Sequence, residues 1–273
     1  MRSKTFAVHL ILGSYTLLAL FPIVLVLMNS VKSRTAIFGA PLAPPGPGTF
    51  SLIGYMKVFS DGAVPLYFFN SLWITVVSIA LTLITGAMAA FALSEYRFRL
   101  NTLTGIYFGL GIMLPIRLGS VAILKLIVDL HLINTRTALI LVYTAQNLPL
   151  AIFILSEFMT QIPKDLREAA RADGVSDHAI FWRIILPLMR PAMATVAVFT
   201  MIPVWNDLWF PLLLAPSGGN QTITLGIQQF IGQYVTDWNA VLAALSAAII
   251  PVLVLYVTFS RQLIRGLTSG AVK

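Results

Sequence analysis

The chain has 273 residues, of which 58% are hydrophobic and only 10% are charged. An ordinary soluble domain carries about 25% charged residues, so this composition excludes that class and predicts an integral membrane protein surrounded by lipid. In a soluble protein the formal net charge of +8 would suggest a nucleic-acid partner. Here basic residues in cytoplasmic loops explain the charge, and we expect no nucleic acid. Cysteine is absent, which excludes disulfides and thiolate chemistry.

The first apolar stretch begins close to the N-terminus. Residues 5–31 carry no charge, and this run is longer than the roughly 20 residues that a transmembrane helix needs. A cleaved signal peptide has an apolar core of only about 7–15 residues, so we predict a retained first transmembrane helix at residues 7–29. The proline-rich residues 32–66 that follow predict an exterior loop with one short interfacial helix around Tyr55.

Three further apolar stretches predict the next three transmembrane helices. The second helix, at residues 69–93, is rich in small and hydroxylated residues, which favour close helix packing and an interior position. The third, at residues 103–126, contains Pro115 and Arg117, and the fourth spans residues 138–159. Each stretch is long enough to cross a bilayer.

The last two predicted helices follow a charged segment at residues 161–191. The fifth helix is expected at residues 192–214 and the sixth at residues 241–262, with a polar exterior loop at residues 215–239 between them. The expected fold is therefore all-α, with six transmembrane helices. The chain divides into residues 1–68 with the first helix and the proline-rich loop, residues 69–263 with five helices and the charged segment, and a tail at residues 264–273.

Six helices place both chain ends on one side of the membrane, and the basic residues indicate which side. The N-terminus, the turn at residues 94–101, the charged segment and the tail together hold twelve Lys and Arg residues, whereas the loops on the opposite side hold five. Because cytoplasmic loops of membrane proteins carry the excess of basic residues, we predict that both ends and the charged segment lie in the cytoplasm.

The charged segment has the local signals of two short helices around a turn. Pro163 suits the first position of one helix, and Gly174 suits its left-handed end. Ser176 can cap the second helix through its hydroxyl, and Val175 and Ile180 are spaced for a hydrophobic staple. These signals favour a docking element for another protein, and a solvated loop with a few helical turns is the alternative.

This segment also carries a long pattern, which reads E-A-A, three residues, G, nine residues, I-x-L-P. The pattern resembles the EAA loop of permease subunits of binding-protein-dependent ABC importers, without any departure in residue type or spacing. In that family the loop is cytoplasmic, and its short helix inserts into a cleft of the ATPase subunit. The resemblance therefore implies a role in ATPase coupling for Glu168, Ala169, Ala170, Gly174, Ile184 and Pro187.

Beyond the EAA loop, roughly residues 65–273 are similar to the carbohydrate-type branch of these permeases, the branch that includes the smaller membrane subunit of the maltose importer. The similarity implies the type I ABC importer permease fold and a place in the bacterial cytoplasmic (inner) membrane. Short motifs in the second, fourth and fifth helices carry it, namely Asn70-Ser71-Leu72, Ala151-Ile152-Phe153 and Trp205-Asn206-Asp207.

The resemblance also implies partners and a substrate. The partners would be a second, related permease subunit, two ATP-binding subunits and an extracytoplasmic solute-binding protein. The substrate would be a sugar, either an oligosaccharide or a sugar derivative. A non-sugar solute such as glycerol phosphate or a polyamine is the alternative for the same architecture, and an ion-driven carrier is the alternative from another class.

Polar side chains inside predicted transmembrane helices are costly, so each is a candidate for the substrate pathway. Trp205, Asn206 and Asp207 follow a proline in the fifth helix, and an aromatic plane beside amide and carboxylate groups suits a sugar. An equally weighted alternative is that Asp207 pairs with a basic residue of a partner subunit. Asn147, next to Gln146 in the fourth helix, is a second candidate.

Arg117, in the third predicted helix, is the remaining pathway candidate. Its long side chain could reach the membrane interface instead of a substrate. If it faces the pathway, it favours an anionic or phosphorylated substrate. The carbohydrate-type branch leads us to expect a glutamine here, so this departure bears directly on the identity of the sugar.

The sequence contains no recognisable catalytic motif. The patterns H-E-x-x-H, G-x-S-x-G and Walker A are absent, and the three histidines lie in different segments. We therefore expect no catalytic residue, no metal site and no cofactor in this chain, and we expect ATP hydrolysis to occur in separate subunits.

Overall fold

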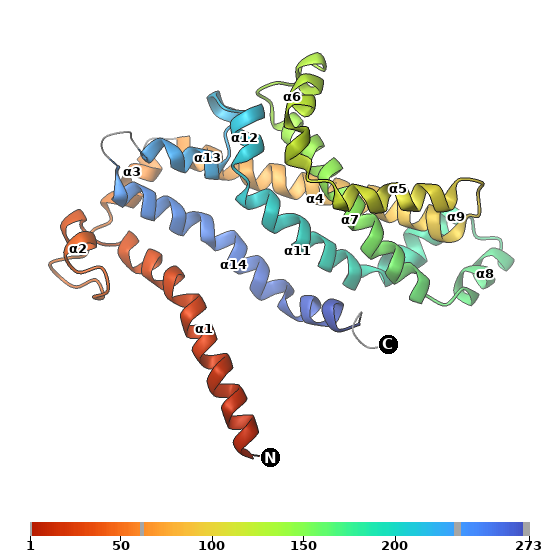
Figure 1. Cartoon of the computed structure of the whole chain (residues 1–273), viewed down its shortest axis with the longest axis horizontal. Helices are drawn as coiled ribbons and strands as arrows, with labels where there is room; N and C mark the ends of the chain where they lie inside the picture. The colour runs from red at the N-terminus through yellow and green to blue at the C-terminus, as the bar shows by residue number, and fades with distance from the viewer. Residues whose placement is uncertain (1, 61–62, 232–235, 270–273) are drawn as a thin grey trace. The chain divides into compact units, whose positions relative to one another are not determined.

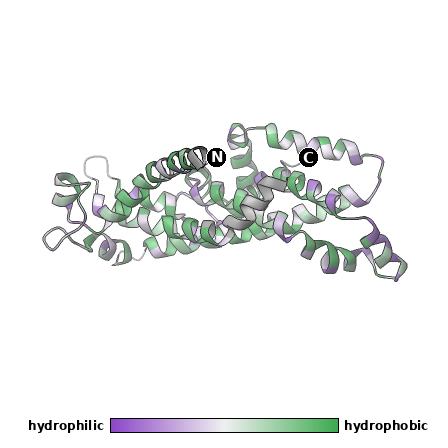
Figure 2. Cartoon of the chain, turned by 90° about the horizontal axis from the view of Figure 1, so that it is seen from below, coloured by the Kyte–Doolittle hydropathy of each residue, from purple (hydrophilic) through white to green (hydrophobic). Residues whose placement is uncertain are grey.

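The chain folds into helices, as its long apolar stretches predict. The computed structural model describes residues 2–60, 63–231 and 236–269, and within these ranges it contains helices and two isolated bridges but no named strand. In Figure 2, hydrophobic residues cover the long helices, and hydrophilic residues gather mainly at helix ends and in loops. The α-helices of eight or more residues are α1 (Arg2–Ser30), α3 (Ile53–Ser60), α4 (Ala63–Glu95), α5 (Asn101–Met113), α6 (Ser120–Asp129), α7 (Arg136–Gln161), α8 (Asp165–Ala172), α11 (Arg190–Asn206) and α14 (Trp238–Ser269).

Shorter helical elements connect these helices. They are α2 (Arg34–Gly39), the 3-10 helix η1 (Ile116–Gly119), α9 (Asp177–Ile180), the π-helix η2 (Phe181–Ile185), α10 (Leu186–Leu188), α12 (Trp209–Leu214), α13 (Ile223–Ile227) and the 3-10 helices η3 (Gly218–Asn220) and η4 (Gln228–Phe230).

The elements form two compact units. The first comprises Met1–Phe68 and Ile223–Pro251, and the second comprises Phe69–Thr222 and Val252–Lys273. The long helices α4 and α14, which are labelled in Figure 1, therefore each contribute residues to both units. The charged segment and all the candidate pathway residues belong to the second unit.

In the first unit, α3 packs against the beginning of α14. A Cβ at Gly54 would lie only 2.2 Å from the carbonyl oxygen of Asn239, so this close approach requires glycine. Lys57 forms an ion pair with Asp237, and the Asn239 side chain donates to the carbonyl of Lys32 at 2.7 Å. The short helix predicted around Tyr55 is confirmed as α3.

By length and composition, three helices of the described residues can each cross a membrane, namely α1, α4 and α7. Two further candidates are bent pairs, in which α5 meets η1 and α6 at 90° and the α9–α10 segment meets α11 at 74°. This makes three spans, or up to five if each pair is one span. The described apolar part of α14, Trp238–Val254, counts as a shorter helix, so the predicted number of six is not confirmed.

The third predicted helix, at residues 103–126, is wrong as a continuous element. Helix α5 ends at Met113, and Leu114 is extended, with φ −83° and ψ 120°. The cause is Pro115, whose ring disfavours helical backbone in the residue before it. The chain resumes as η1 and then α6 after the sharp bend.

The fifth predicted helix, at residues 192–214, is also interrupted. Helix α11 ends at Asn206, Asp207 is extended, and α12 begins at Trp209. Pro203 lies inside α11 without ending it, so the break follows from the carboxylate of Asp207, which accepts hydrogen bonds from the first N–H groups of α12.

The predicted exterior loop at residues 215–239 is partly wrong as well. It contains α13, whose Ile223, Leu225 and Ile227 are buried in the first unit. A Cβ at Gly226 would lie 2.3 Å from the ring of Tyr67, so glycine allows α13 to pack tightly. Four residues of this loop, 232–235, lie outside the described residues, as do residues 270–273 of the predicted tail.

The core of the second unit joins α4, α7 and α11 to the charged segment. Ala87 of α4 and Ala151 of α7 are completely buried, and a Cβ at Gly86 would lie 3.1 Å from the Ala151 methyl group. Small residues therefore let α4 and α7 approach closely. The interior position predicted for this helix holds for one face only, because Ser71, Thr75, Ser78 and Thr82 are buried. Trp73, Val76 and Met88 on its other side are exposed.

Candidate functional site

The first turn of α8 is set by Lys164. Its carbonyl accepts the N–H of Glu168 at 3.0 Å, which makes Lys164 the N-cap, and Asp165 and Glu168 place negative charge in the first turn. The sequence placed Pro163 at the first helical position, but Pro163 precedes the cap. It ends α7 instead, because Ile162 before it is extended, with φ −77° and ψ 124°.

The last turn of α8 is closed by Gly174. Its φ is +78°, and its N–H donates to the carbonyl of Arg171 at 3.0 Å. The next N–H, of Val175, donates to the carbonyl of Ala170 at 2.9 Å. These two bonds are a Schellman motif, and they confirm the predicted left-handed end.

The second helix of the charged segment begins where the sequence predicts it. The hydroxyl of Ser176 accepts the N–H of Ala179 at 3.4 Å. Ile180 is completely buried, and Val175 packs against the same apolar cluster, which confirms the predicted cap and staple.

This second helix continues as a π-helix and not as a regular α-helix. The N–H of Leu186 donates to the carbonyl of Phe181, five residues earlier. Pro187 lacks an N–H and cannot continue the regular ladder, which accounts for the wider turn at this place. Of the coupling candidates here, Ile184 is partly buried against the apolar cluster and Pro187 is exposed.

The helix α8 presents two different faces. Arg167 and Ala170 point into the second unit, where Ala170 is 8% exposed and joins the apolar cluster. Glu168 and Ala169 are exposed, and so is Leu166, at 47%. The two alanines of the motif therefore have opposite surroundings, and only Ala169 is open to a partner.

Beneath α8 lies a charge cluster centred on Glu95, the last residue of α4. Its carboxylate accepts hydrogen bonds from Arg167 at 2.6 Å and from Arg171 at 2.5 Å. The side chains of Glu95 and Arg167 are only 10% and 4% exposed. Because a buried charge is stable only when it is paired, each of these two residues depends on the other.

Arg171 extends this cluster to α9. Its Nε donates to Asp177 at 2.8 Å, and the hydroxyl of Tyr96 donates to the other carboxylate oxygen at 2.8 Å. The hydrogen bonds from Arg171 and then from Tyr96 lower the pKa of Asp177 below its ordinary value. The same hydrogen bond to Asp177 raises the pKa of Tyr96.

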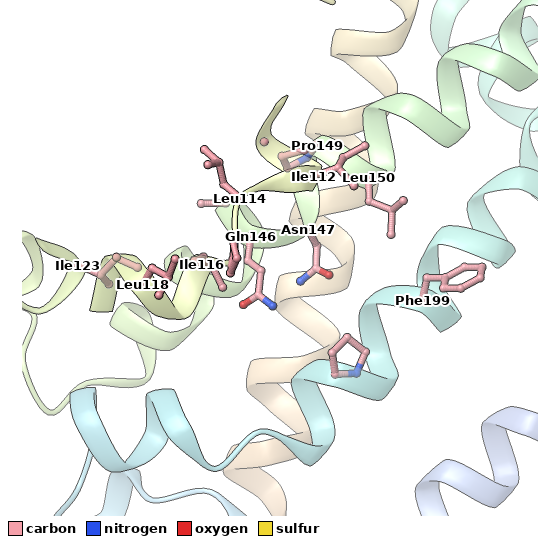
Figure 3. Close-up of a pocket in the computed structure, with 15 residues that line it drawn as sticks. Ile112, Leu114, Ile116, Leu118, Ile123, Gln146, Asn147, Pro149, Leu150 and Phe199 are labelled. Carbon is pink, nitrogen blue, oxygen red and sulfur yellow. The ribbon is translucent and has the colours of Figure 1, made fainter. Parts of the chain in front are cut away.

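A second candidate site is a cavity of about 640 Å³, lined by residues of α5, η1, α6, α7 and α11. Figure 3 shows Gln146 and Asn147 on α7, with their amide groups directed toward the space between η1 and α11. The Asn147 amide donates to the carbonyl one turn earlier at 2.7 Å. The Oε1 atom of Gln146 is buried and has no hydrogen-bond partner among the described residues. The other lining residues have no polar side chain, and three of them are Pro115, Pro149 and Pro203.

Asp207 lies outside this cavity lining and has a structural task. Its carboxylate accepts hydrogen bonds from the hydroxyl of Tyr143 at 2.9 Å and from the N–H groups of Trp209 and Phe210 at 3.2 and 3.0 Å. It also lies 3.5 Å from the guanidinium of Arg117. The basic partner of Asp207 is therefore found within this chain.

The other three pathway candidates lie near this carboxylate in the sequence or in space. Arg117 is 68% exposed, and Trp205 is buried. Asn206 is exposed, and its amide donates to the carbonyl of Ile202 in its own helix at 2.8 Å. The structure thus does not gather the five pathway candidates around one cavity, and only Asn147 lines the one described here.

Two residues that contribute to these sites, Glu95 and Tyr143, were not identified as site residues from the sequence. Glu95 is the only acidic residue between Asp61 and Asp129, which is a usable signal for a special role in a chain so poor in charge. Tyr143 had no such signal, because a tyrosine in an apolar helix is common. Among the described residues no group of His, Cys, Asp and Glu is arranged to hold a metal ion.

Residues 82–268, more than half of the chain, match the family described as binding-protein-dependent transport system inner membrane component. The chain belongs to this family. It is a multi-pass membrane permease, a component of an ABC transporter of the sugar-transport class. The family supports the interpretation of residues 161–191 as its EAA loop.

Two similar permease proteins match this permease over most of the length of both chains. It is 31% identical over 264 residues to the diacetylchitobiose uptake system permease protein NgcG of Streptomyces coelicolor, covering 96% of this chain and 87% of NgcG. It is 31% identical over 259 residues to the arabinooligosaccharides transport system permease protein AraQ of Halalkalibacterium halodurans, covering 94% and 92%.

The fold of the permease is found in a solved ABC importer. One chain of a bacterial ABC transporter involved in the import of the acidic polysaccharide alginate aligns with a TM-score of 0.79 and 24% identity. The alignment covers 95% of this permease and 96% of that chain. The all-α permease fold predicted from the sequence is therefore confirmed.

Proposed function

We propose that this permease carries an oligosaccharide or another sugar derivative across the bacterial inner membrane, with both chain ends in the cytoplasm. NgcG belongs to an uptake system for diacetylchitobiose, and AraQ belongs to a system for arabinooligosaccharides. The two relatives cover nearly the whole permease and handle short sugar polymers, which supports the same substrate class here. The bias of basic residues supports the orientation.

The proposed assembly contains a second, related permease subunit, two ATP-binding subunits and an extracytoplasmic solute-binding protein. ATP is hydrolysed by the ATP-binding subunits. Their closure displaces α8, and the helices of the core at residues 69–263 change from an inward-facing to an outward-facing arrangement. The binding protein then releases its sugar into the open pathway. Residues 1–68 and the tail at residues 264–273 lie outside this core.

The observation that carries the coupling proposal is the outward face of α8. An eight-residue helix closed by a Schellman motif presents Leu166, Glu168 and Ala169 to the outside, while Ala170 anchors it inside. An exposed leucine beside a small residue on a rigid helix suits insertion into a groove of another protein. Ile184 and Pro187 act from the following segment, where Ile184 packs against the core that holds α8.

For the substrate pathway we propose the cavity beside α7. Gln146 and Asn147 offer amide groups on an otherwise apolar wall, and amides both donate to and accept from sugar hydroxyls. Asp207, Trp205 and Asn206 shape the neighbouring helix break and support the pathway indirectly. Arg117 is exposed enough to meet a passing solute.

The coupling proposal is tested by crosslinking at the two alanines, because the chain has no cysteine of its own. Ala169→Cys is expected to crosslink to a cysteine in the groove of the co-purified ATPase. Ala170→Cys is the matched control, since it is one residue away but buried, and it is expected to crosslink far less. Equal capture at both positions, or none at Ala169, would contradict docking through this face.

The substrate is tested on the solute-binding protein encoded with the permease. Diacetylchitobiose and arabinotriose are expected to raise its melting temperature, whereas glycerol 3-phosphate and spermidine are expected to leave it unchanged. Stabilisation by either of the last two instead would replace the sugar with the alternative solute. Purification of this chain alone as an active, ion-driven carrier would overturn the ABC assembly.

A further inference from the structure

The end of α4 and the helix α8 are joined by charged hydrogen bonds as well as by apolar contacts. Glu95 accepts from Arg167 through one carboxylate oxygen at 2.6 Å and from Arg171 through the other at 2.5 Å. We call Glu95, Arg167 and Arg171 the ionic clasp. Since Arg167 is 4% exposed, this is a buried connection and not a pair of solvated surface charges.

The chain itself does not link these two elements closely. Glu95 and Arg167 are 72 residues apart, whereas α8 follows α7 directly and leads through α9 toward α11. A displacement of α8 can therefore reach α7 and α11 directly along the backbone, whereas α4 is connected to α8 in the chain only through α5, α6 and α7. The direct connection between α8 and α4 is therefore non-covalent. The clasp supplies the directional part of those contacts.

Apolar packing alone would let α8 slide or turn on α4, because it is non-directional. The rings of Phe91 and Phe181 lie 5.4 Å apart, and Ala170 packs in the same cluster, so such packing is present. Hydrogen bonds from planar guanidinium groups to both oxygens of one carboxylate fix distance and direction together. Arg171 also holds Asp177, so α9 is held in the same arrangement.

We propose that the ionic clasp makes α8, α9 and the end of α4 one rigid body, so that an ATPase displacing α8 also moves α4. Glu95, Arg167 and Arg171 are then positioning residues for transport. They neither touch the substrate nor bind nucleotide. The proposal rests on the proposed docking of α8, and it goes beyond it by assigning the residues through which the movement enters α4.

Distance measurements between spin labels test the rigid body without any substrate. The labels are attached at Val76→Cys on α4 and Ala172→Cys on α8, which are both exposed and the only cysteines of the doubly substituted chain. In the assembled complex the distance distribution is expected to stay the same between the nucleotide-free and the vanadate-trapped ATP states. With Arg167→Met added, it is expected to broaden and to differ between the two states.

The matched control is Arg183→Met, which removes an exposed arginine of the same charged segment whose side chain has no ion pair or hydrogen bond among the described residues. It is expected to leave the distances unchanged. Distances that already vary with nucleotide state in the parent complex, or that stay fixed in Arg167→Met, would overturn the clasp.

Transport gives a second readout, the number of sugar molecules taken up per ATP hydrolysed. Arg167→Met is expected to lower this ratio about tenfold, in the range of ordinary coupling effects between sites. The exchanged pair Glu95→Arg with Arg167→Glu is expected to recover part of it. A structural role alone would lower assembly, hydrolysis and uptake in parallel and leave the ratio unchanged, which would also overturn the proposal.

These results separate the clasp from the docking of α8. If Ala169→Cys still crosslinks to the ATPase but Arg167→Met changes neither the spin-label distances nor the transport ratio, the clasp proposal is wrong and the docking proposal stands. If Ala169→Cys fails to crosslink in the parent complex, the docking itself is wrong.

Discussion

Two shielded carboxylates of the second unit, Glu95 and Asp207, each lie beside an arginine, and they differ in which groups satisfy the carboxylate. In the ionic clasp, Glu95 accepts from Arg167 at 2.6 Å, and both side chains are almost fully buried. At the break between α11 and α12, Asp207 is similarly shielded, but Arg117 lies 3.5 Å away and is 68% exposed.

The difference shows that an arginine beside a shielded carboxylate does not contribute equally to stability at every site. Asp207 is held by a tyrosine hydroxyl and two backbone N–H groups, so its arginine adds little. Glu95 has charged donors, and one of them, Arg167, depends on it to remain buried. In the ionic clasp, stability depends on both partners of the ion pair. At the helix break, it depends on the carboxylate of Asp207 and not on Arg117.

The largest effect is expected from Glu95→Ala, which leaves the buried Arg167 without its carboxylate. Removing one partner of a buried pair costs about 3–5 kcal/mol, so the free energy of local opening of α8 should fall by that amount. Hydrogen exchange of the α8 amides in the purified complex measures it. Asp173→Ala, which removes an exposed carboxylate directly after the same helix, is the control and should change the value by less than about 0.5 kcal/mol. Equal effects of the two variants would contradict the comparison.

The next largest effect is expected from Asp207→Ala. Tyr143 and the first N–H groups of α12 would lose their acceptor, and a buried donor left unsatisfied costs about 1–3 kcal/mol. The melting temperature of the detergent-solubilised complex should fall accordingly. Tyr143→Phe removes only one donor and should cost less, about 0.5–1.5 kcal/mol. A larger loss in Tyr143→Phe than in Asp207→Ala would show that the carboxylate is not the centre of this cluster.

A smaller effect is expected from Gly174→Ala at the end of α8. A Cβ there would contact nothing within 4 Å, so the cost comes only from holding alanine at φ +78°. That strain is worth about 1 kcal/mol, and it should appear as faster hydrogen exchange in the last turn of α8. Gly174→Asn should cost less, because asparagine tolerates this backbone region. A cost for asparagine as large as for alanine would indicate that a partner needs the space.

The ends of α8 illustrate what the sequence can predict. Gly174 and Ser176 act on backbone groups within four residues, so their roles follow from local rules and are confirmed by the Schellman motif and the serine cap. Pro163 shows the limit even here. The sequence predicted it at the first position of α8, but it precedes the N-cap Lys164 and ends α7 instead.

The clasp and the helix breaks could not be predicted in this way. Glu95 and Arg167 meet across 72 residues, and no local pattern reports such a contact. Pro115 and Pro203 look alike in the sequence, yet only the first stands at a break, and the fifth predicted helix ends where Asp207 finds donors in the folded chain. The roles in coupling and transport stay predictions, because they concern partners and a substrate.

Removal of Arg117 is expected to have only a small effect on stability. Arg117→Gln should change the melting temperature of the complex by the equivalent of less than about 1 kcal/mol, because the pair is long and its arginine is exposed. Uptake provides the second measurement. If Arg117 faces the pathway, the variant should lose uptake of anionic sugars while neutral ones are unaffected. Unchanged uptake of every anionic sugar tested would remove Arg117 from the pathway.

The smallest effect concerns pH at the exposed end of the charge cluster. The lowered pKa of Asp177 means that its stabilisation is complete above the ordinary value of 3.8 and is lost as pH falls through the lower folded value. The raised pKa of Tyr96 means the reverse, with stabilisation complete below 10.0 and lost as pH rises through the higher folded value. The difference in hydrogen exchange of α9 between the parent and Asp177→Asn should therefore be constant from about pH 5 to 9. The difference should become smaller at lower pH, where Asp177 is protonated, and it should also change at high pH, where Tyr96 is deprotonated. Tyr96→Phe should remove the change at high pH. A difference that varies near neutral pH would mean that a group other than Asp177 and Tyr96 controls this contact.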